Sequence, residues 1–247
     1  MTGISYTKLR CEYSRKEISS MILAVFSIIF IFFLLKWRMT DFSIPTAISY
    51  IVFLIILIGG ATYLASYLQK RTGMMRGYDV EYTNNSLFLI LGIVITFLFQ
   101  AGVLVLVPGM FHLSPMRTRL GYYRVSVHER DIARVALYGS ATYFSIGLLL
   151  GLLYLISNSN IFREGAGMLA ILALFSLIPT PKNSGIAVFK WSPLILGVCL
   201  AIVLLYLMLI LLGIPSGGSI LLAALLGAVI FGALFFLDLL PRLIYGS

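Results

Sequence analysis

The chain has 247 residues, of which 60% are hydrophobic and 11% are charged, and its mean hydropathy is +1.03. A soluble domain needs about 25% charged residues to keep its surface wetted, so the composition excludes an ordinary water-soluble protein. The formal net charge is +9, but Lys and Arg lie almost wholly between the apolar runs, where an anionic cytoplasmic leaflet retains them. This placement argues against nucleic-acid binding and makes a lipid bilayer the expected surrounding.

Several apolar runs are long enough to cross that bilayer, which takes about 20 residues. In chain order they are Ser19–Leu35, Thr46–Leu68, Leu87–Val107, Arg134–Ile156, Leu194–Leu212 and Ser219–Leu240, and a shorter run covers Ala166–Ile178. Pro45 stands at the start of the second run, where the missing N–H of a proline costs nothing. We therefore expect a helix to begin there.

Two stretches alternate residue by residue instead. Tyr78 to Tyr82 and Tyr123 to His128 place aromatic or β-branched residues at every second position, a pattern typical of short β-strands. The two predicted strands bracket Leu87–Val107, and the breaker pair Pro108-Gly109 follows this run. The bracketed segment is therefore a candidate for a turn inside the membrane rather than a crossing.

The distribution of Lys and Arg separates these two possibilities. If every run crosses, the 18 basic residues divide 8 to 10 between the two sides of the membrane. If Leu87–Val107 turns back, Lys36, Arg38 and Arg163 lie on one side of the membrane and the other 15 lie on the opposite side. Cytoplasmic loops carry the excess of basic residues. We therefore expect an all-α polytopic membrane protein with about six transmembrane helices, both termini in the cytoplasm, and a re-entrant segment flanked by short β-strands. Such a segment survives only where protein or water covers it, which predicts a sheltered groove on the cytoplasmic side.

Few residues are able to carry chemistry inside a membrane. Eight of the nine acidic residues lie in predicted tails or loops, and Asp238 ends the last apolar run. This distribution argues against proton-coupled transport and buried acid–base catalysis. His112 and His128, with Glu129 and Asp131 nearby, are weak candidates for a metal site because their spacing matches no known metal-binding motif.

Three segments resemble, in order, the site-2 protease family of intramembrane zinc metalloproteases, particularly its archaeal members. Gly60–Gly73 lies where that family carries H-E-x-x-H and a basic, glycine-terminated segment. Pro108-Gly109 and Arg134–Ser140 lie where the family has a P-G loop and a helix that opens with A-G-P. Phe175–Gly185 is similar to the family's N-x-x-P-x-x-P-L-D-G segment. The matching framework residues are Pro108, Gly109, Gly139, Pro179, Pro181 and Gly185.

The family's zinc-binding residues are missing from these segments. In the family, two histidines four positions apart and a distant aspartate bind zinc, and a glutamate acts as general base. Here Ala61, Ala65 and Ser184 stand at the ligand positions, and Thr62 stands at the position of the glutamate. Alanine has no lone pair to donate, and threonine accepts no proton near neutral pH. The resemblance therefore implies a catalytically inactive member of the family, without a metal or another cofactor.

Small residues on the apolar runs have a packing interpretation, because small residues four apart let membrane helices approach closely. The helix-packing candidates are Gly60, Ala61, Ala65, Gly147, Gly151, Ala224, Ala228 and Gly232. Between the predicted strands and the next helix, Arg117, Arg119 and Arg124 are expected to contact lipid phosphates or an acidic partner.

The sequence thus predicts a cytoplasmic N-terminal tail (1–18) and one membrane domain (19–247), which contains the site-2 protease-like core (60–191) and a C-terminal helical hairpin (194–240). By resemblance, its expected function is that of an inactive scaffold in the plasma membrane of a prokaryote. It would bind another integral membrane protein, as an accessory or assembly subunit, or hold a transmembrane segment without cleaving it. Two alternatives stay open: an active metalloprotease with its metal moved to the loop from His112 to Asp131, and a small transporter or lipid-binding protein.

Overall fold

The computed structural model describes residues 13–39, 43–84, 86–99, 105–106, 109–115, 117–118, 121–122, 127–180 and 183–211. Within these residues, five helices are long and apolar enough to cross a membrane: Arg15–Trp37, Ile44–Met75, Glu129–Ser157, Asn160–Leu177 and Pro193–Ile210. They indicate a helical, multi-pass membrane protein. The run predicted at Ser219–Leu240 lies outside the described residues.

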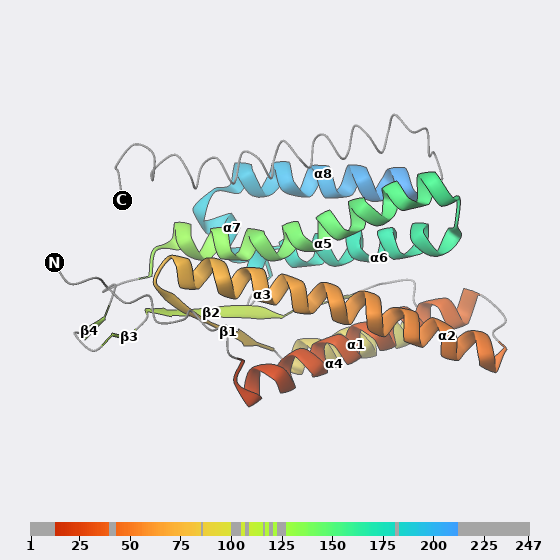
Figure 1. The fold of residues 1–247 in the computed structure, drawn as a ribbon, viewed down its shortest axis with the longest axis horizontal. Helices are drawn as coiled ribbons and strands as arrows, with labels where there is room; N and C mark the ends of the chain where they lie inside the picture. Colours follow the sequence, from red (N-terminus) through yellow and green to blue (C-terminus); the bar gives the residue numbers. More distant parts are fainter. Residues whose placement is uncertain are drawn as a thin grey trace.

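The elements follow one another along the chain as α1 (Arg15–Met39), α2 (Ile44–Leu54), the π-helical turn η1 (Ile55–Gly59), α3 (Gly60–Met75), β1 (Tyr78–Thr83), α4 (Ser86–Leu98), β2 (Met110–Pro115), β3 (Arg117–Thr118), β4 (Gly121–Tyr122), α5 (Glu129–Ser157), α6 (Asn160–Leu177), α7 (Ser184–Trp191) and α8 (Pro193–Leu211). Figure 1 shows α5, α6 and α8 side by side, with α3 packed against α5 and with α1 and α4 beyond α3. The β1–β2 ribbon, α7 and the first turn of α5 gather at one end of the bundle, on the left in Figure 1.

The helices predicted at Ser19–Leu35, Thr46–Leu68, Arg134–Ile156 and Leu194–Leu212 are confirmed, with longer bounds in most cases. Pro45 lies in the first turn of α2, as expected. The helix α6 starts at Asn160 rather than at Ala166 and is long enough to cross. The polar residues of its first turns hide this start in the sequence. Glu164 is compensated by Lys36 at the end of α1, a partner that lies far away in the chain.

The strand β1 is confirmed where the alternation predicted it, and its partner is a strand that no sequence pattern indicated. β1 pairs antiparallel with β2, with Tyr78 opposite Pro115 and Thr83 opposite Met110. Of the stretch predicted as the second strand, residues 123–126 lie outside the described residues, and His128 is the N-cap of α5. The sequence of β2 gives a weak signal because Leu113 is its one buried residue.

The register of the ribbon brings together the two ends of the segment between its strands. Because Thr83 lies opposite Met110, residues 84–109 leave and return at the same end of the ribbon. The helix α4 has 13 residues, or about 20 Å at 1.5 Å per residue, which is shorter than the ~30 Å hydrocarbon core of a bilayer. The returning chain passes directly against α4, since a Cβ at Gly92 would come within 2.6 Å of the Val105 carbonyl oxygen.

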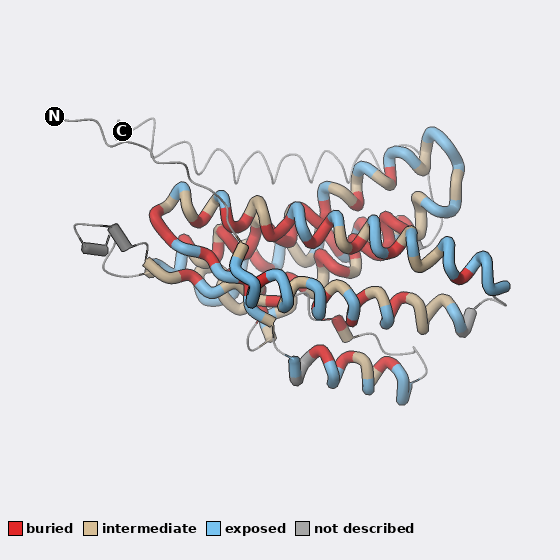
Figure 2. Tube along the Cα trace, turned by 60° about the horizontal axis from the view of Figure 1, so that its bottom comes forward, coloured by how far each residue is buried: buried red, intermediate tan, exposed pale blue. Residues whose placement is uncertain are grey.

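Burial follows the same arrangement. Figure 2 shows the buried positions concentrated in the interior of the helix bundle, whereas the outer surfaces of the helices are exposed. Many of these exposed side chains are large and apolar, among them Ile22, Phe26, Ile56, Leu194 and Met208. A surface of this kind is stable in contact with lipid tails rather than water.

Candidate functional site

The segments that carry the family resemblance meet around a small cavity with several hydroxyl groups in its lining. Thr62 comes from α3, Gly139 from α5 and Ser184 from the start of α7, and Gly109 precedes β2. The other lining residues are Ser66, Gln69, Tyr82, Phe111, Ala136, Ser140, Tyr143 and Ser176. The cavity measures about 10 Å³, close to the space that one water molecule needs. The positions of the family's glutamate and aspartate therefore face the same cavity in this fold.

The two positions that match the zinc-binding histidines lie on the same buried side of α3. Ala61 is 3% exposed and Ala65 is 2% exposed, and both belong to the main apolar core. With 3.6 residues per turn, positions 61, 62 and 65 share one face of the helix. All three side chains point into the bundle, and the methyl groups of Ala61 and Ala65 pack in the apolar core.

The cavity's hydroxyl groups bond partly to one another and partly to backbone carbonyls, such as that of Ala173, which accepts from Ser176. The Tyr143 hydroxyl donates to Thr62 Oγ1 over 3.3 Å, and Ser140 and Ser176 are joined by an Oγ–Oγ hydrogen bond of 2.7 Å. Burial raises the pKa of the Tyr82 phenol well above its ordinary value, so its hydroxyl stays protonated at neutral pH. No Asp, Glu, His, Lys or Arg is among the described lining residues of the cavity.

Three framework glycines allow the close contacts that shape this cavity. A Cβ at Gly109, whose φ is +98°, would overlap the Tyr82 phenol. A Cβ at Gly139 would overlap the side-chain amide of Gln69, and one at Gly185 would overlap the Leu177 carbonyl oxygen. Of the framework prolines, Pro179 lies exposed after α6, while Pro108 and Pro181 fall outside the described residues.

Asn183 fixes the start of α7 and was missed by the sequence analysis. Its Oδ1 accepts the Ser184 amide at 2.8 Å, and its Nδ2 donates to the carbonyl oxygens of Phe175 and Ile178 at 2.7 and 2.9 Å. An Asn directly before a helix is a common N-cap, so the signal was present in the sequence. These bonds hold Ser184 at the edge of the cavity.

An open groove of about 200 Å³ adjoins the cavity. It is lined by Met110, Phe111 and Leu113 of β2, by Glu129, Ile132, Val135 and Ala136 of α5, and by Asn183, Ser184, Ile186, Ala187 and Lys190 at α7. Most of the lining is apolar, and the charged residues Glu129 and Lys190 are exposed. Phe111, Ala136 and Ser184 line both spaces, so the groove and the cavity are contiguous.

The strand β2 presents an unpaired edge beside this groove. The backbone N–H of Tyr82 in β1 points away from β2, because it donates to Glu17 Oε1 at 3.1 Å. Val80, two residues earlier in the strand, directs its backbone groups to the same side. In an antiparallel pair the N–H and C=O of one residue point to the same side. Phe111 and Leu113, which lie opposite these residues, therefore direct their backbone groups away from β1. Within the described structure β2 pairs with β1 alone.

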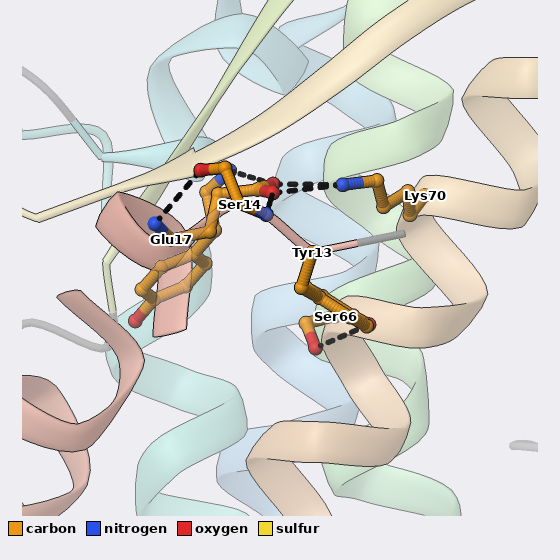
Figure 3. A network of polar contacts seen from close by, with 6 residues as sticks. Tyr13, Ser14, Glu17, Ser66 and Lys70 are labelled. Carbon is orange, nitrogen blue, oxygen red and sulfur yellow. Dashed lines mark hydrogen bonds and ion pairs between the residues drawn. The ribbon is translucent and has the colours of Figure 1, made fainter. Parts of the chain in front are cut away.

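A buried ion pair holds the ribbon and the cavity-lining helix together. Lys70 Nζ lies 2.9 and 3.0 Å from the two carboxylate oxygens of Glu17, and both side chains are about 5% exposed or less. Tyr13 stacks over Lys70 with 4.7 Å between Nζ and the ring centre, and its hydroxyl lies 3.2 Å from Ser66 Oγ (Figure 3). Glu17 thus links α1, α3 and β1.

Glu17 belongs to the predicted N-terminal tail, residues 1–18, and the described part of this tail includes the first turn of α1. Glu17 lies in the first turn of α1, where it accepts the Ser14 amide at 2.7 Å and donates its own amide to Ser14 Oγ at 3.2 Å. This reciprocal pair is a capping box, and the pattern Ser-x-x-Glu could have revealed it. Asp131, expected in a loop, is likewise helical and accepts hydrogen bonds from Arg76 and Tyr78.

Besides Ala61 and Ala65, the packing candidates divide into three groups. Gly147 lies where α5 meets α6, since a Cβ there would be 3.4 Å from that of Leu169, and at Gly151 a Cβ would be 2.5 Å from the Tyr206 hydroxyl of α8. Gly60 is exposed, and a Cβ there would have no described atom within 4 Å, so its packing role stays a prediction. The remaining candidates Ala224, Ala228 and Gly232 lie outside the described residues.

The surface and metal candidates are placed only in part. Arg117 is part of the strand β3, but its side chain lies outside the described structure. Arg119 and Arg124 lie outside the described residues altogether. His112 is exposed on β2 opposite Glu81, and His128 is exposed before α5. Among the described residues no three His, Cys, Asp or Glu side chains are grouped so as to hold a metal ion.

Comparisons with known proteins provide no relative to set beside this geometry. Protein-family models, curated proteins and solved structures were all searched, and none matches the chain. The groove, the cavity and the residues around them are therefore the basis for assigning a function.

Proposed function

We propose that this protein is a catalytically inactive, site-2 protease-like scaffold that binds another integral membrane protein in the groove beside β2. The observation that carries the proposal is the junction of an apolar groove and of a β2 edge that no described strand pairs with, at a cavity lined by Thr62 and Ser184. The client would be held as a partner of a membrane complex, or as a bound segment, and would remain uncleaved.

The chemistry of the cavity supports binding without hydrolysis. Peptide hydrolysis by a metalloprotease requires a Lewis acid to activate water and a base to accept its proton. Methyl groups occupy the two histidine positions, Ala61 and Ala65, and both are in the packed core. One serine hydroxyl at position 184 does not replace three zinc ligands, and Thr62 is not a base.

The groove supports recognition of an extended segment. An exposed strand edge accepts a further strand through main-chain hydrogen bonds, while side chains of the added strand enter neighbouring pockets. The apolar lining from Phe111 to Ala187 favours a client with apolar residues. A membrane protein supplies such residues next to its transmembrane helices, and its own backbone groups are stabilised by pairing where water is scarce.

The proposal includes an orientation in the plasma membrane of a prokaryote, with both termini and the groove on the cytoplasmic side. The strand β2 and the end of α5 lie at opposite ends of the bundle (Figure 1). We therefore expect a cysteine at Ser114 to react with a membrane-impermeant maleimide only in inside-out vesicles, and a cysteine at Ser157 only in intact cells. Labelling of both positions from the same side would contradict this topology.

Site-specific cross-linking tests the binding proposal. A photoreactive amino acid at Ile186, in the groove, is expected to give discrete adducts with an uncleaved membrane protein in native membranes. The matched control is Leu149, which is exposed on the outer face of α5 and is expected to give lipid adducts. Identical adduct patterns from both positions, or lipid alone from the groove, would favour a lipid-binding protein. Zinc retained in stoichiometric amount by the purified protein, or cleavage lost in Thr62→Val, would overturn the inactive-scaffold proposal.

A further inference from the structure

We infer that the cavity beside the groove is a recognition pocket for one hydroxyl-bearing side chain, Ser or Thr, of the bound segment. This inference rests on the proposed function, because it assigns a sequence preference to the client held in the groove. The cavity and the groove share Phe111, Ala136 and Ser184. A segment paired along β2 therefore passes the cavity entrance.

The size of the cavity limits what enters it. A volume of about 10 Å³ accommodates one water-sized group. A hydroxyl has this size, whereas a carboxamide, an imidazole or an aromatic ring is too large. Neighbouring groups give little room for expansion, since the Tyr82 phenol and the Gln69 amide already lie against Gly109 and Gly139.

Two hydroxyl groups in the lining of the cavity favour a hydroxyl over a methyl group of the same size. The hydroxyl hydrogens of Thr62 and Ser184 have no hydrogen-bond acceptor among the described residues. Both hydroxyls are therefore able to donate to an incoming oxygen, and their lone pairs are able to accept its hydrogen. An apolar side chain would desolvate these groups without replacing their bonds.

The charged residues of the groove indicate which part of a membrane protein supplies the bound segment. Glu129 and Lys190 are exposed on its lining, and neither forms an ion pair with another described residue. A juxtamembrane segment matches this distribution, because charged residues flank its apolar run and complement both signs. The client is thus a membrane protein with Ser or Thr among apolar residues, close to a charged membrane boundary.

Two matched peptides test the preference on the purified full-length protein in detergent. Each alternates valine with glutamine, so that the valines share one face of a strand, and carries flanking lysines and a fluorophore. One peptide has threonine at the centre of the valine face, and the other has its isostere valine. We expect the threonine peptide to bind about five- to tenfold more tightly, which is the effect of one net hydrogen bond.

Variants connect the preference to the cavity. Thr62→Val and Ser184→Ala are each expected to reduce the ratio of the two affinities toward one, whereas Ser145→Ala, on an exposed face of α5, keeps it. Equal binding of both peptides to the unmodified protein would overturn the hydroxyl preference and leave the groove proposal standing. If neither peptide binds, and neither reduces the cross-linking of the natural client at Ile186, the proposed function fails together with the inference.

Discussion

Replacing Lys70 with Met is expected to lower the free energy of unfolding by about 3–5 kcal/mol, because it leaves the carboxylate of Glu17 buried without its counter-ion. Both side chains are almost wholly enclosed, so water does not reach the remaining charge. The two amides of Ser14 and Tyr82 that donate to Glu17 reduce this cost only in part. Denaturant unfolding in mixed micelles, followed by circular dichroism, measures the difference.

Two further variants separate the buried charge from other consequences of the substitution. Lys190→Met removes an exposed charge and is expected to change the free energy of unfolding by no more than about 0.5 kcal/mol. The double variant Glu17→Gln with Lys70→Met should regain much of the lost stability, because no unpaired charge remains. Equal effects of Lys70→Met and Lys190→Met would show that the Glu17–Lys70 pair does not hold α1 against α3.

This ion pair illustrates what the sequence does not reveal. Hydropathy identified the apolar helices because the energetics of a membrane span depend on local composition. The partners of a buried charge are non-local: Glu17 and Lys70 are separated by most of two helices, and neither belongs to an apolar run. Each was therefore assigned to a tail or a loop, although the capping-box pattern at Ser14 places Glu17 in a helix.

The ribbon shows a second limit. The alternation in β1 is visible because Tyr78, Val80 and Tyr82 are buried on one face while Asp79 and Glu81 are exposed. The strand β2 is buried at Leu113 alone, since one of its sides lines the open groove rather than the core. A strand that faces an open groove has no strict polar alternation to recognise, so β2 was the least visible element of the ribbon in the sequence.

The candidate site itself was predictable by position but not by shape. Resemblance selected Thr62, Gly109, Gly139 and Ser184 from distant parts of the chain, and the fold places all four around one cavity. The cavity's hydroxyl lining also depends on Tyr82, Ser140, Tyr143 and Ser176, which no motif singled out. Their convergence results from the packing of α3, β1, α5 and α6, which hydrophobic patterns along one chain do not specify.

Gly185→Ala is expected to have the second large effect, because a methyl group there would overlap the backbone of Leu177 and lie 2.7 Å from the Ile178 carbonyl oxygen. Backbone atoms in a helix end cannot rotate away as a side chain does. The turn that Asn183 closes onto Ile178 would have to open, which we expect to cost about 1–3 kcal/mol or more. Thermal unfolding in detergent measures this loss.

The same substitution connects stability with function, because Gly185 follows Ser184 at the junction of groove and cavity. Displacement of α7 should move Ile186 and Ser184 away from β2, so we expect a marked loss of the groove cross-link at temperatures where the variant remains folded. Gly197→Ala is the matched control: it adds the same methyl group to α8, where no described atom lies within 4 Å, and a helical Gly→Ala change is expected to be neutral or stabilising by up to about 1 kcal/mol. If Gly185→Ala kept both its stability and the cross-link, the close approach of α7 to the end of α6 would not be what forms the groove.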